Sequence, residues 1–346
     1  MSSVIQPDSI LKDLSELWVT LGKESDGDAS AGVLRACAMT LVATAEEAED
    51  PGIVGETLAS LMREHPSRAI VIRFRPSTAR ELSARVFAQC WMPFGRRRQI
   101  CCEQIEITAS EASLPELPPV ILPLTVSDLP VILWCRSWRL FQLPDFPALA
   151  QIAQKVVVDS AAFPEPAEIL RQLAARARAG QALGDLVWTR LTRWRELVAQ
   201  MFENKSYLCR LPEVSEVRIT HGGPSPPTMA YYLAAWLQDG LEKAGAAAQV
   251  RWQADQAATA GELKQVELAA PGVNAMWVSI GLTGDRETQV AELDMDSIVS
   301  RTAFPVANDY VLLREELSIP GRDAVFERTL MRALRLVEAH LSGRQL

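Results

Sequence analysis

The feature that most constrains the fold is a strand, helix, strand alternation in the first quarter of the chain. Residues 33–43 form an apolar run of strand length, and residues 53–62 carry apolar side chains at helical spacing. That helix must end at His65, because the residue before a proline is pushed out of the helical region. Residues 68–74 form a second apolar run. This order is typical of two parallel strands joined by a crossover helix, so we expect an α/β fold with a mainly parallel N-terminal sheet.

The next segments extend this sheet. Residues 82–90 alternate apolar and polar side chains, and residues 99–108 are again strand-like, which predicts an antiparallel hairpin. A second crossover unit and two helices are expected after it: strand 129–135, helix 147–153, strand 155–158 and helices 166–180 and 189–203.

The last third of the chain predicts a smaller C-terminal α/β domain. Its expected elements are strand 214–220, helix 227–245, strands 249–253, 263–268, 276–282 and 289–293, and helix 322–341, which Gly343 ends. Short turn segments separate the later strands, so we expect a mixed or antiparallel sheet. The predicted divisions are an N-terminal helix and linker at 1–32, an N-terminal domain at 33–208 and a C-terminal domain at 209–346.

Charge and hydropathy limit the partners and the compartment. The chain of 346 residues has 35 Lys and Arg against 43 Asp and Glu, a net charge of −8, which disfavours nucleic acid and anionic membranes as partners. The first 23 residues show no basic segment followed by an apolar stretch. The most apolar run, at 120–126, is far shorter than the ~20 residues that cross a bilayer. We expect a cytoplasmic protein with no membrane partner.

The common catalytic and metal-binding motifs are absent. The sequence has none of the glycine-rich nucleotide loops, the HExxH zinc motif or the GxSxG nucleophile motif. Its three histidines are isolated in sequence, which disfavours a metal site or a catalytic triad. We therefore expect no catalytic residues, no metal and no cofactor.

Two loops are weak candidates for binding an anion. His221-Gly222-Gly223 lies between a predicted strand and a predicted helix, where backbone N–H groups can hold phosphate, although a plain turn is the commoner explanation. Arg96, Arg97 and Arg98 lie at the predicted hairpin tip, where guanidinium groups bind carboxylate or phosphate or are simply solvated.

The six cysteines are scattered and show no CxxC spacing, which predicts reduced thiols that mostly fill the core. Cys101 and Cys102 are adjacent and must face opposite sides of a strand. Cys90 is expected to lie opposite one of them across the hairpin, so a disulfide there is an alternative.

Tryptophan is unusually abundant, with nine Trp against four Tyr. Trp134 with Trp138 and Trp188 with Trp194 occur in short blocks, and Trp is favoured at interfaces because it offers a large area with few rotatable bonds. Core packing is the alternative and is favoured for Trp194, on the apolar face of its helix. Trp138, after the end of a strand, is the better surface candidate.

Two blocks carry a family resemblance: DLVWTRLTRWREL at 185–197 and SDLPVILW at 127–134. With the segments at 34–37, 65–71, 157–160 and 232–237, they resemble the glucose-6-phosphate dehydrogenase assembly protein family, OpcA. Arg193 stands where that family usually has Pro, and Cys135 where it commonly has a second Trp.

The resemblance implies a non-catalytic protein that binds glucose-6-phosphate dehydrogenase and promotes its assembly or active state in the oxidative pentose phosphate pathway. A sugar-phosphate-binding protein or enzyme that uses the His221 loop is the alternative. The resemblance and the Trp and Arg blocks mark these residues as family-motif or partner-binding candidates: Asp128, Pro130, Trp134, Trp138, Asp185, Trp188, Thr189, Arg190, Trp194, Arg195, Glu196, Arg96, Arg97 and Arg98. Asp185 and Thr189 are expected at a helix entry, and Arg190, Arg195 and Glu196 in fixed polar contacts.

Overall fold

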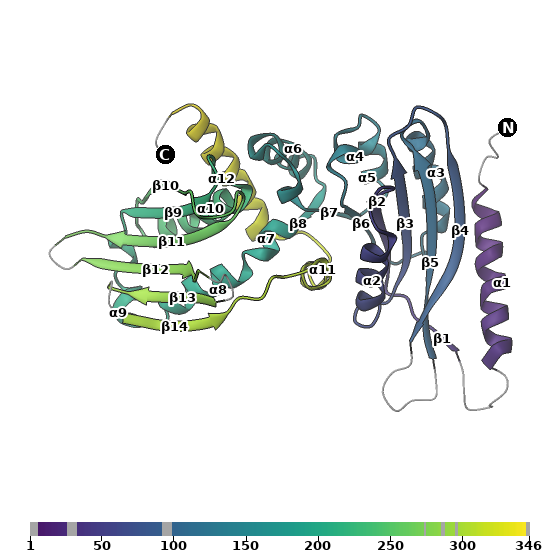
Figure 1. The fold of residues 1–346 in the computed structure, drawn as a ribbon, viewed down its shortest axis with the longest axis horizontal. Helices are drawn as coiled ribbons and strands as arrows, with labels where there is room; N and C mark the ends of the chain where they lie inside the picture. Colours follow the sequence, from purple (N-terminus) through teal and green to yellow (C-terminus); the bar gives the residue numbers. More distant parts are fainter. Residues whose placement is uncertain are drawn as a thin grey trace. The chain divides into compact units, whose positions relative to one another are not determined.

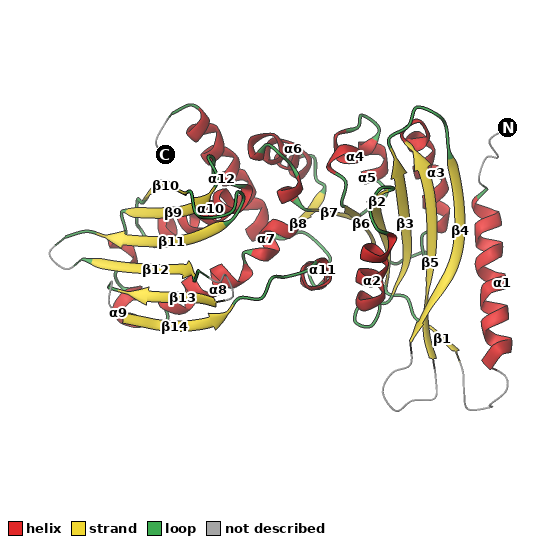
Figure 2. Ribbon diagram, in the orientation of Figure 1, coloured by secondary structure: helices red, strands yellow, loops and turns green. Residues whose placement is uncertain are grey.

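The chain forms two compact units in a computed structural model that describes residues 6–25, 33–91, 99–272, 275–284, 288–294 and 297–343. Unit 1 consists of Met1–Val158 and Asp309–Arg322, and unit 2 of Asp159–Asn308 and Asp323–Leu346. The units therefore divide at 158/159, whereas the sequence placed the boundary at 208/209. Figures 1 and 2 show the elements of both units, coloured by position in the chain and by secondary structure.

The sheet of unit 1 has the strand order β4-β5-β3-β2-β6-β7, in which every pair is parallel except the antiparallel hairpin β4/β5. Strand β1 pairs in parallel with the beginning of β5, on the same edge as β3. The strands are β1 (Val33–Arg35), β2 (Met39–Glu46), β3 (Ser67–Arg75), β4 (Leu82–Trp91), β5 (Gln99–Ser110), β6 (Val131–Cys135) and β7 (Lys155–Val158). The predicted parallel sheet and hairpin are confirmed, although the run at 33–43 is divided between β1 and β2.

The helices of unit 1 are short apart from the first two: α1 (Pro7–Ser25), α2 (Pro51–Leu61), α3 (Leu117–Ile121), α4 (Trp138–Gln142), α5 (Phe146–Ala150) and α11 (Asp309–Leu317). The sequence did not predict α11, which returns from the C-terminal half of the chain. It is held by Lys155, a fully buried side chain whose Nζ lies 2.6 Å from the Glu316 carboxylate and also donates to the Ile319 carbonyl.

Unit 2 contains a six-stranded sheet with the order β10-β9-β11-β12-β13-β14. Only β10 and β9 are parallel, so the sheet is mixed, one of the two predicted forms. The strands are β9 (Glu216–Gly222), β10 (Gln249–Asp255), β11 (Leu263–Ala270), β12 (Met276–Leu282), β13 (Thr288–Leu293) and β14 (Ser297–Ala303). Strand β14 and the short β8 (Ala182–Asp185), also in unit 2, were not predicted.

The helices of unit 2 are α6 (Pro166–Arg178), α7 (Leu186–Arg190), α8 (Thr192–Met201), α9 (Lys205–Leu208), α10 (Thr228–Lys243) and α12 (Ala324–Leu341). Helix α10 packs against β9 and α12, and α8 packs against β12. The helix predicted at 189–203 is in fact two helices that meet at Leu191. Short 3-10 helices in the chain are Glu111–Glu116, Leu122–Leu124, Ser160–Ala162 and Leu211–Glu213.

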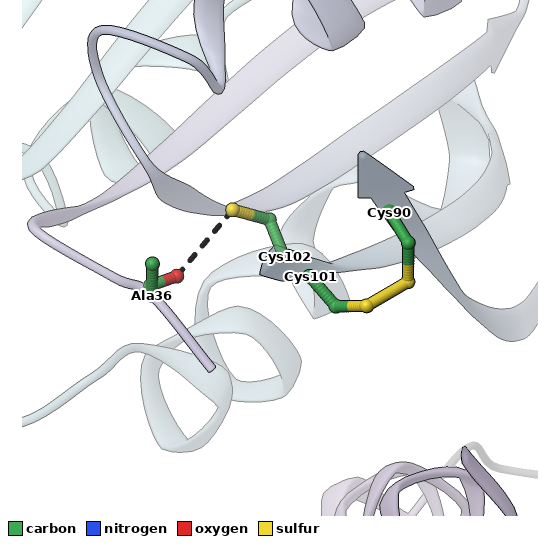
Figure 3. Close-up of a disulfide and its surroundings, with 4 residues drawn as sticks. All are labelled: Ala36, Cys90, Cys101 and Cys102. Atoms are coloured by element: carbon green, nitrogen blue, oxygen red, sulfur yellow. Dashed lines mark hydrogen bonds between the residues drawn. A yellow bond between two sulfur atoms is a disulfide. The ribbon is translucent and has the colours of Figure 1, made fainter. Parts of the chain in front are cut away.

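The hairpin of unit 1 places Cys90 directly opposite Cys101, and the two form a disulfide (Figure 3). The expectation of reduced thiols is therefore wrong for this pair, and the alternative, a disulfide between Cys90 and one of the two adjacent cysteines, is confirmed. The sequence did not decide between Cys101 and Cys102, because the register of the hairpin is set in the folded chain. Cys102 points to the other side, where its Sγ donates to the Ala36 carbonyl. Burial raises the pKa of the Cys102 thiol to about 11.

Candidate functional site

Asp185, the first residue of the longer family block, is a buried junction within unit 2. It ends β8 and is the N-cap of α7, the predicted helix entry. Its Oδ1 accepts the N–H groups of Ser160, at 3.1 Å, and Val187, at 3.0 Å, and its Oδ2 accepts the Tyr232 hydroxyl at 2.8 Å. The carboxyl group therefore joins β8 and α7 to a preceding loop and to α10.

Burial dominates the electrostatics of this junction. Desolvation raises the pKa of Asp185 to about 6, although hydrogen bonds from Ser160 and Val187 favour the charged form. Burial, and then the neighbouring charge of Asp185, hold the pKa of Tyr232 well above its ordinary value of 10.0. Tyr232 is therefore a neutral donor, and Asp185 is a carboxyl whose charge is poorly solvated.

Trp188 connects the same block to the last helix. Its indole Nε1 donates to Asp323 Oδ2 at 3.2 Å, and Asp323 caps α12 by accepting two N–H groups at its start. The Arg195 guanidinium lies 3.6 Å from the centre of the indole ring, a cation–π contact. Sequence reasoning missed Asp323 as a cap because the helix was predicted to begin at 322, whereas α12 begins at Ala324 and Asp323 is its N-cap.

The rest of the block is also built into unit 2. Arg190 forms a two-pronged ion pair with Asp159, with N–O distances of 2.7 and 2.6 Å, and Thr189 Oγ1 donates to the Asp185 carbonyl. Trp194 is buried and contacts Phe304. The fixed polar contacts predicted for Arg190 and Arg195 are present, and Arg195 donates to Thr192 Oγ1 at 2.9 Å. The prediction that Thr189 lies at a helix entry is wrong, because α7 already begins at Leu186 and Thr189 lies within it. Glu196 is exposed, and no polar partner of its side chain lies among the described residues.

The second family block belongs to unit 1. Trp134, in β6, is 1% exposed and packs under the Arg136 guanidinium. Asp128 lies in an exposed turn with a φ of 65°, and the Pro130 carbonyl accepts the Thr40 N–H at 2.8 Å. These residues hold the beginning and the interior of a strand.

Trp138 differs from the other tryptophans of the blocks because it is 38% exposed. It is the first residue of α4, and the N-cap Ser137 fixes that position by accepting the Leu140 N–H. The candidates Arg96, Arg97 and Arg98 lie outside the described residues.

The glycines of the His221 loop are explained by close packing of the chain. A Cβ on Gly222 would lie 1.9 Å from the Thr259 carbonyl oxygen, and Gly223 has a φ of +89°. His221 is buried, and desolvation lowers the pKa of its imidazole. A tight turn requires both glycines whether or not a ligand binds.

A cleft of about 370 Å³ nevertheless lies beside this loop, between the start of α10, the loop at 160–166 and the turn at 260–261. Its walls are mostly apolar and proline-rich, and Glu165 is the one charged residue among those described along it. His221 is not among them. A carboxylate and no cation is a poor match for a sugar phosphate.

The described ranges hold neither a metal-binding cluster nor a membrane-spanning helix. No three His, Cys, Asp or Glu side chains there gather closely enough to hold a metal ion. No described helix combines the length and the apolar character needed to cross a membrane.

Comparison with known proteins finds two family models that together match more than half of the chain. Residues 59–175 match the glucose-6-phosphate dehydrogenase subunit N-terminal domain, and residues 181–330 match the C-terminal domain of the same subunit. The OxPP cycle protein OpcA of Nostoc punctiforme is 30% identical over 178 residues, which are 50% of this chain and 37% of that protein. The OxPP cycle protein OpcA of Synechocystis is 27% identical over 209 residues, which are 58% of this chain and 43% of that protein. The matches thus span less than half of each relative.

Solved structures show distant likenesses. The aldose-aldose oxidoreductase of Caulobacter crescentus has a TM-score of 0.48 and 13% identity, covering 89% of this chain and 99% of that chain. Glucose-6-phosphate 1-dehydrogenase of Mycobacterium avium has the same score and identity, with 87% and 92% covered. At these values neither likeness carries an argument about function.

Proposed function

Because this chain belongs to the OpcA family of glucose-6-phosphate dehydrogenase assembly proteins, we propose that it binds the dehydrogenase and stabilises its active state. In this proposal the chain catalyses no reaction of its own. It acts in the cytoplasm and promotes the entry of glucose 6-phosphate into the oxidative pentose phosphate pathway. The family match over both units is the observation that carries the proposal.

The position of the family segments supports a binding role. Segments at 157–160, 185–197 and 232–237 are far apart in sequence, yet Ser160, Asp185 and Tyr232 meet in one buried hydrogen-bond cluster. These three side chains are 0% exposed, so they stabilise the fold of unit 2 and do not contact a partner directly. The exposed members of the longer family block, such as Glu196, stay accessible to a partner.

Trp138 is the proposed anchor in unit 1. It combines a large apolar ring, an indole donor and substantial exposure, and a capped helix start holds it in place. Exposed aromatic side chains on rigid supports are typical interface hot spots, because little entropy is lost when they are buried. Arg139, also exposed, adds a positive charge beside it.

The proposed mechanism is a shift between states of the dehydrogenase. A protein partner changes such an equilibrium only by binding one state more tightly than the other. A coupling free energy of about 1 to 3 kcal/mol raises the ratio of active to inactive dehydrogenase about five- to 150-fold. By reciprocity, glucose 6-phosphate tightens the complex if it favours the same state of the dehydrogenase.

The test is kinetic and uses two variants. Dehydrogenase rate is measured against glucose 6-phosphate with the wild-type chain, with Trp138→Ala and with Ile319→Ala, a truncation at another exposed apolar side chain of unit 1. The wild type and Ile319→Ala should change KM, kcat or oligomeric state, whereas Trp138→Ala should weaken binding at least tenfold. An unchanged dehydrogenase at saturating wild-type chain would refute the proposal.

The alternative function, direct binding of a sugar phosphate, is not favoured by the cleft beside the His221 loop, because Glu165 is the one charged residue described along it. If the isolated chain did bind glucose 6-phosphate, adding this ligand would raise the melting temperature, because a ligand stabilises the state that binds it. No shift at millimolar ligand removes this candidate and leaves the first unaffected.

A further inference from the structure

The six-stranded sheet of unit 2 has two chemically different faces. Across β9, β11 and β12, one face carries Ile219, Val266 and Ile280 in register, and all three are buried. This is the side against which the helices pack. Side chains alternate along a strand, so the intervening residues point the other way.

These intervening residues form the open face, which consists of three rows in register across the strands. The rows are Gln253, Thr220, Gln265, Gly281, Val290 and Arg301; Arg251, Arg218, Glu267, Ser279, Glu292 and Ile298; and Gln249, Glu216, Ala269 and Trp277. Among the described elements of unit 2, no helix lies over these rows (Figure 2). The Arg251 and Arg218 side chains are 59% and 41% exposed.

The polar side chains of the open face are ordered before any partner arrives. Glu216 binds Arg218 at 2.6 Å and Arg251 at 2.9 Å, and Glu267 accepts the indole N–H of Trp277 at 3.0 Å. A pre-ordered surface loses little side-chain entropy when it is covered. The open face is also large enough for an interface. Six strands spaced ~4.8 Å apart, each about seven residues long at ~3.3 Å per residue, cover about 650 Å² in projection. This area is near the ~800 Å² per partner of a standard interface.

We propose that the open face binds the same face of a second copy of this chain. The face has three Arg and three Glu, so it is locally neutral in a chain of net charge −8, where two copies otherwise repel each other. A twofold axis along the strands, between β11 and β12, superposes β9 of one copy on β13 of the other. Arg218 then faces Glu292, and the reciprocal pair forms on the other side of the axis.

The same axis matches side-chain sizes. It places Trp277 over Ala269 and Gln265 over Gly281, a large side chain opposite a small one in each case. Aligned strands are the usual arrangement of two sheets packed face to face, and a twofold axis makes every contact occur twice. At these positions the open face is complementary to itself in charge and in size, although Arg251 faces Ile298 in the middle row, and a second copy is the occupant that these pairs select.

The test measures self-association of the full chain by sedimentation from nanomolar to high-micromolar concentration. Wild type should dimerise. In Glu292→Arg, the new arginine faces Arg218 of the other copy at both symmetry-related positions. In Arg218→Glu, the new glutamate faces Glu292 of the other copy. Each variant therefore places like charges together and should raise the dimer Kd at least about tenfold. Glu203→Arg makes the same charge change at an exposed residue outside the open face and should leave the Kd unchanged.

A mixture of Glu292→Arg with Arg218→Glu gives the decisive result. In a mixed dimer both cross-copy pairs are again opposite in charge, so association should return, and circular dichroism checks that each variant is folded. A wild type that stays monomeric throughout, or a Glu292→Arg chain that dimerises as tightly as wild type, overturns the proposal. If the wild type is monomeric and Glu292→Arg instead no longer binds the dehydrogenase, then the open face binds the dehydrogenase and self-association is refuted.

Discussion

The buried carboxyl of Asp185 should make the stability of unit 2 depend on pH. Its pKa is about 6 in the folded chain against an ordinary value of 3.8, so folding favours the protonated form. The stabilisation is complete below about pH 3.8 and is lost as the pH rises through about 6, because the unfolded chain then binds fewer protons than the folded chain. At ~1.4 kcal/mol per pH unit the loss is about 3 kcal/mol.

Asp185→Asn tests this value, because the amide is neutral at every pH. Its oxygen can still accept the N–H groups of Ser160 and Val187, and its NH₂ group can donate to the Tyr232 hydroxyl. The variant should therefore gain about 3 kcal/mol relative to wild type between about pH 4 and about pH 7. Asp185→Ala removes all three hydrogen bonds and should lose about 3 kcal/mol or more.

Urea unfolding followed by tryptophan fluorescence measures both variants, and hydrogen exchange at the Ser160 and Val187 amides reports the junction directly. Asp50→Asn changes an N-cap carboxyl on the exposed start of α2 and serves as the matched control. A constant difference between Asp185→Asn and wild type across this pH range would refute the reasoning, since it would mean that Asp185 is equally charged in the folded and unfolded chain.

Three further predictions follow from the packing. Replacing Cys90 by Ser, or reducing its disulfide with Cys101, should lower the free energy of unfolding by about 3 kcal/mol in a urea titration, since the bridge closes a short loop in the unfolded chain. Gly222→Ala should lose at least about 2 kcal/mol to a backbone clash, whereas Gly55→Ala, in open space on α2, should gain about 0.5 to 1 kcal/mol; equal melting temperatures would contradict this. Lys155→Ala should cost about 3 to 5 kcal/mol and free α11 to limited proteolysis, and a protected α11 would speak against it.

Local sequence determined most of the fold. The apolar runs at 68–74 and 155–158 are buried strands, and the helical stripes at 227–245 and 322–341 are α10 and α12. The strands were predictable because a short continuous apolar run indicates a strand buried on both faces, and the helices because a period of 3.6 in apolar residues reports which side is buried. Asp185 as a helix N-cap was predictable for a similar reason, since a cap needs only its own next few residues.

Tertiary structure decided what depends on distant pairing. Strand β14 mixes polar and apolar residues in both of its alternating sets, and the buried stripe of α11 includes Glu316, so neither element has a clear apolar period. The disulfide required the register of a hairpin, and the buried cluster required that Ser160, Asp185 and Tyr232 come from three separate segments. A sequence pattern records which side chains avoid water, whereas the identity of the group that each one meets is set by the whole folded chain.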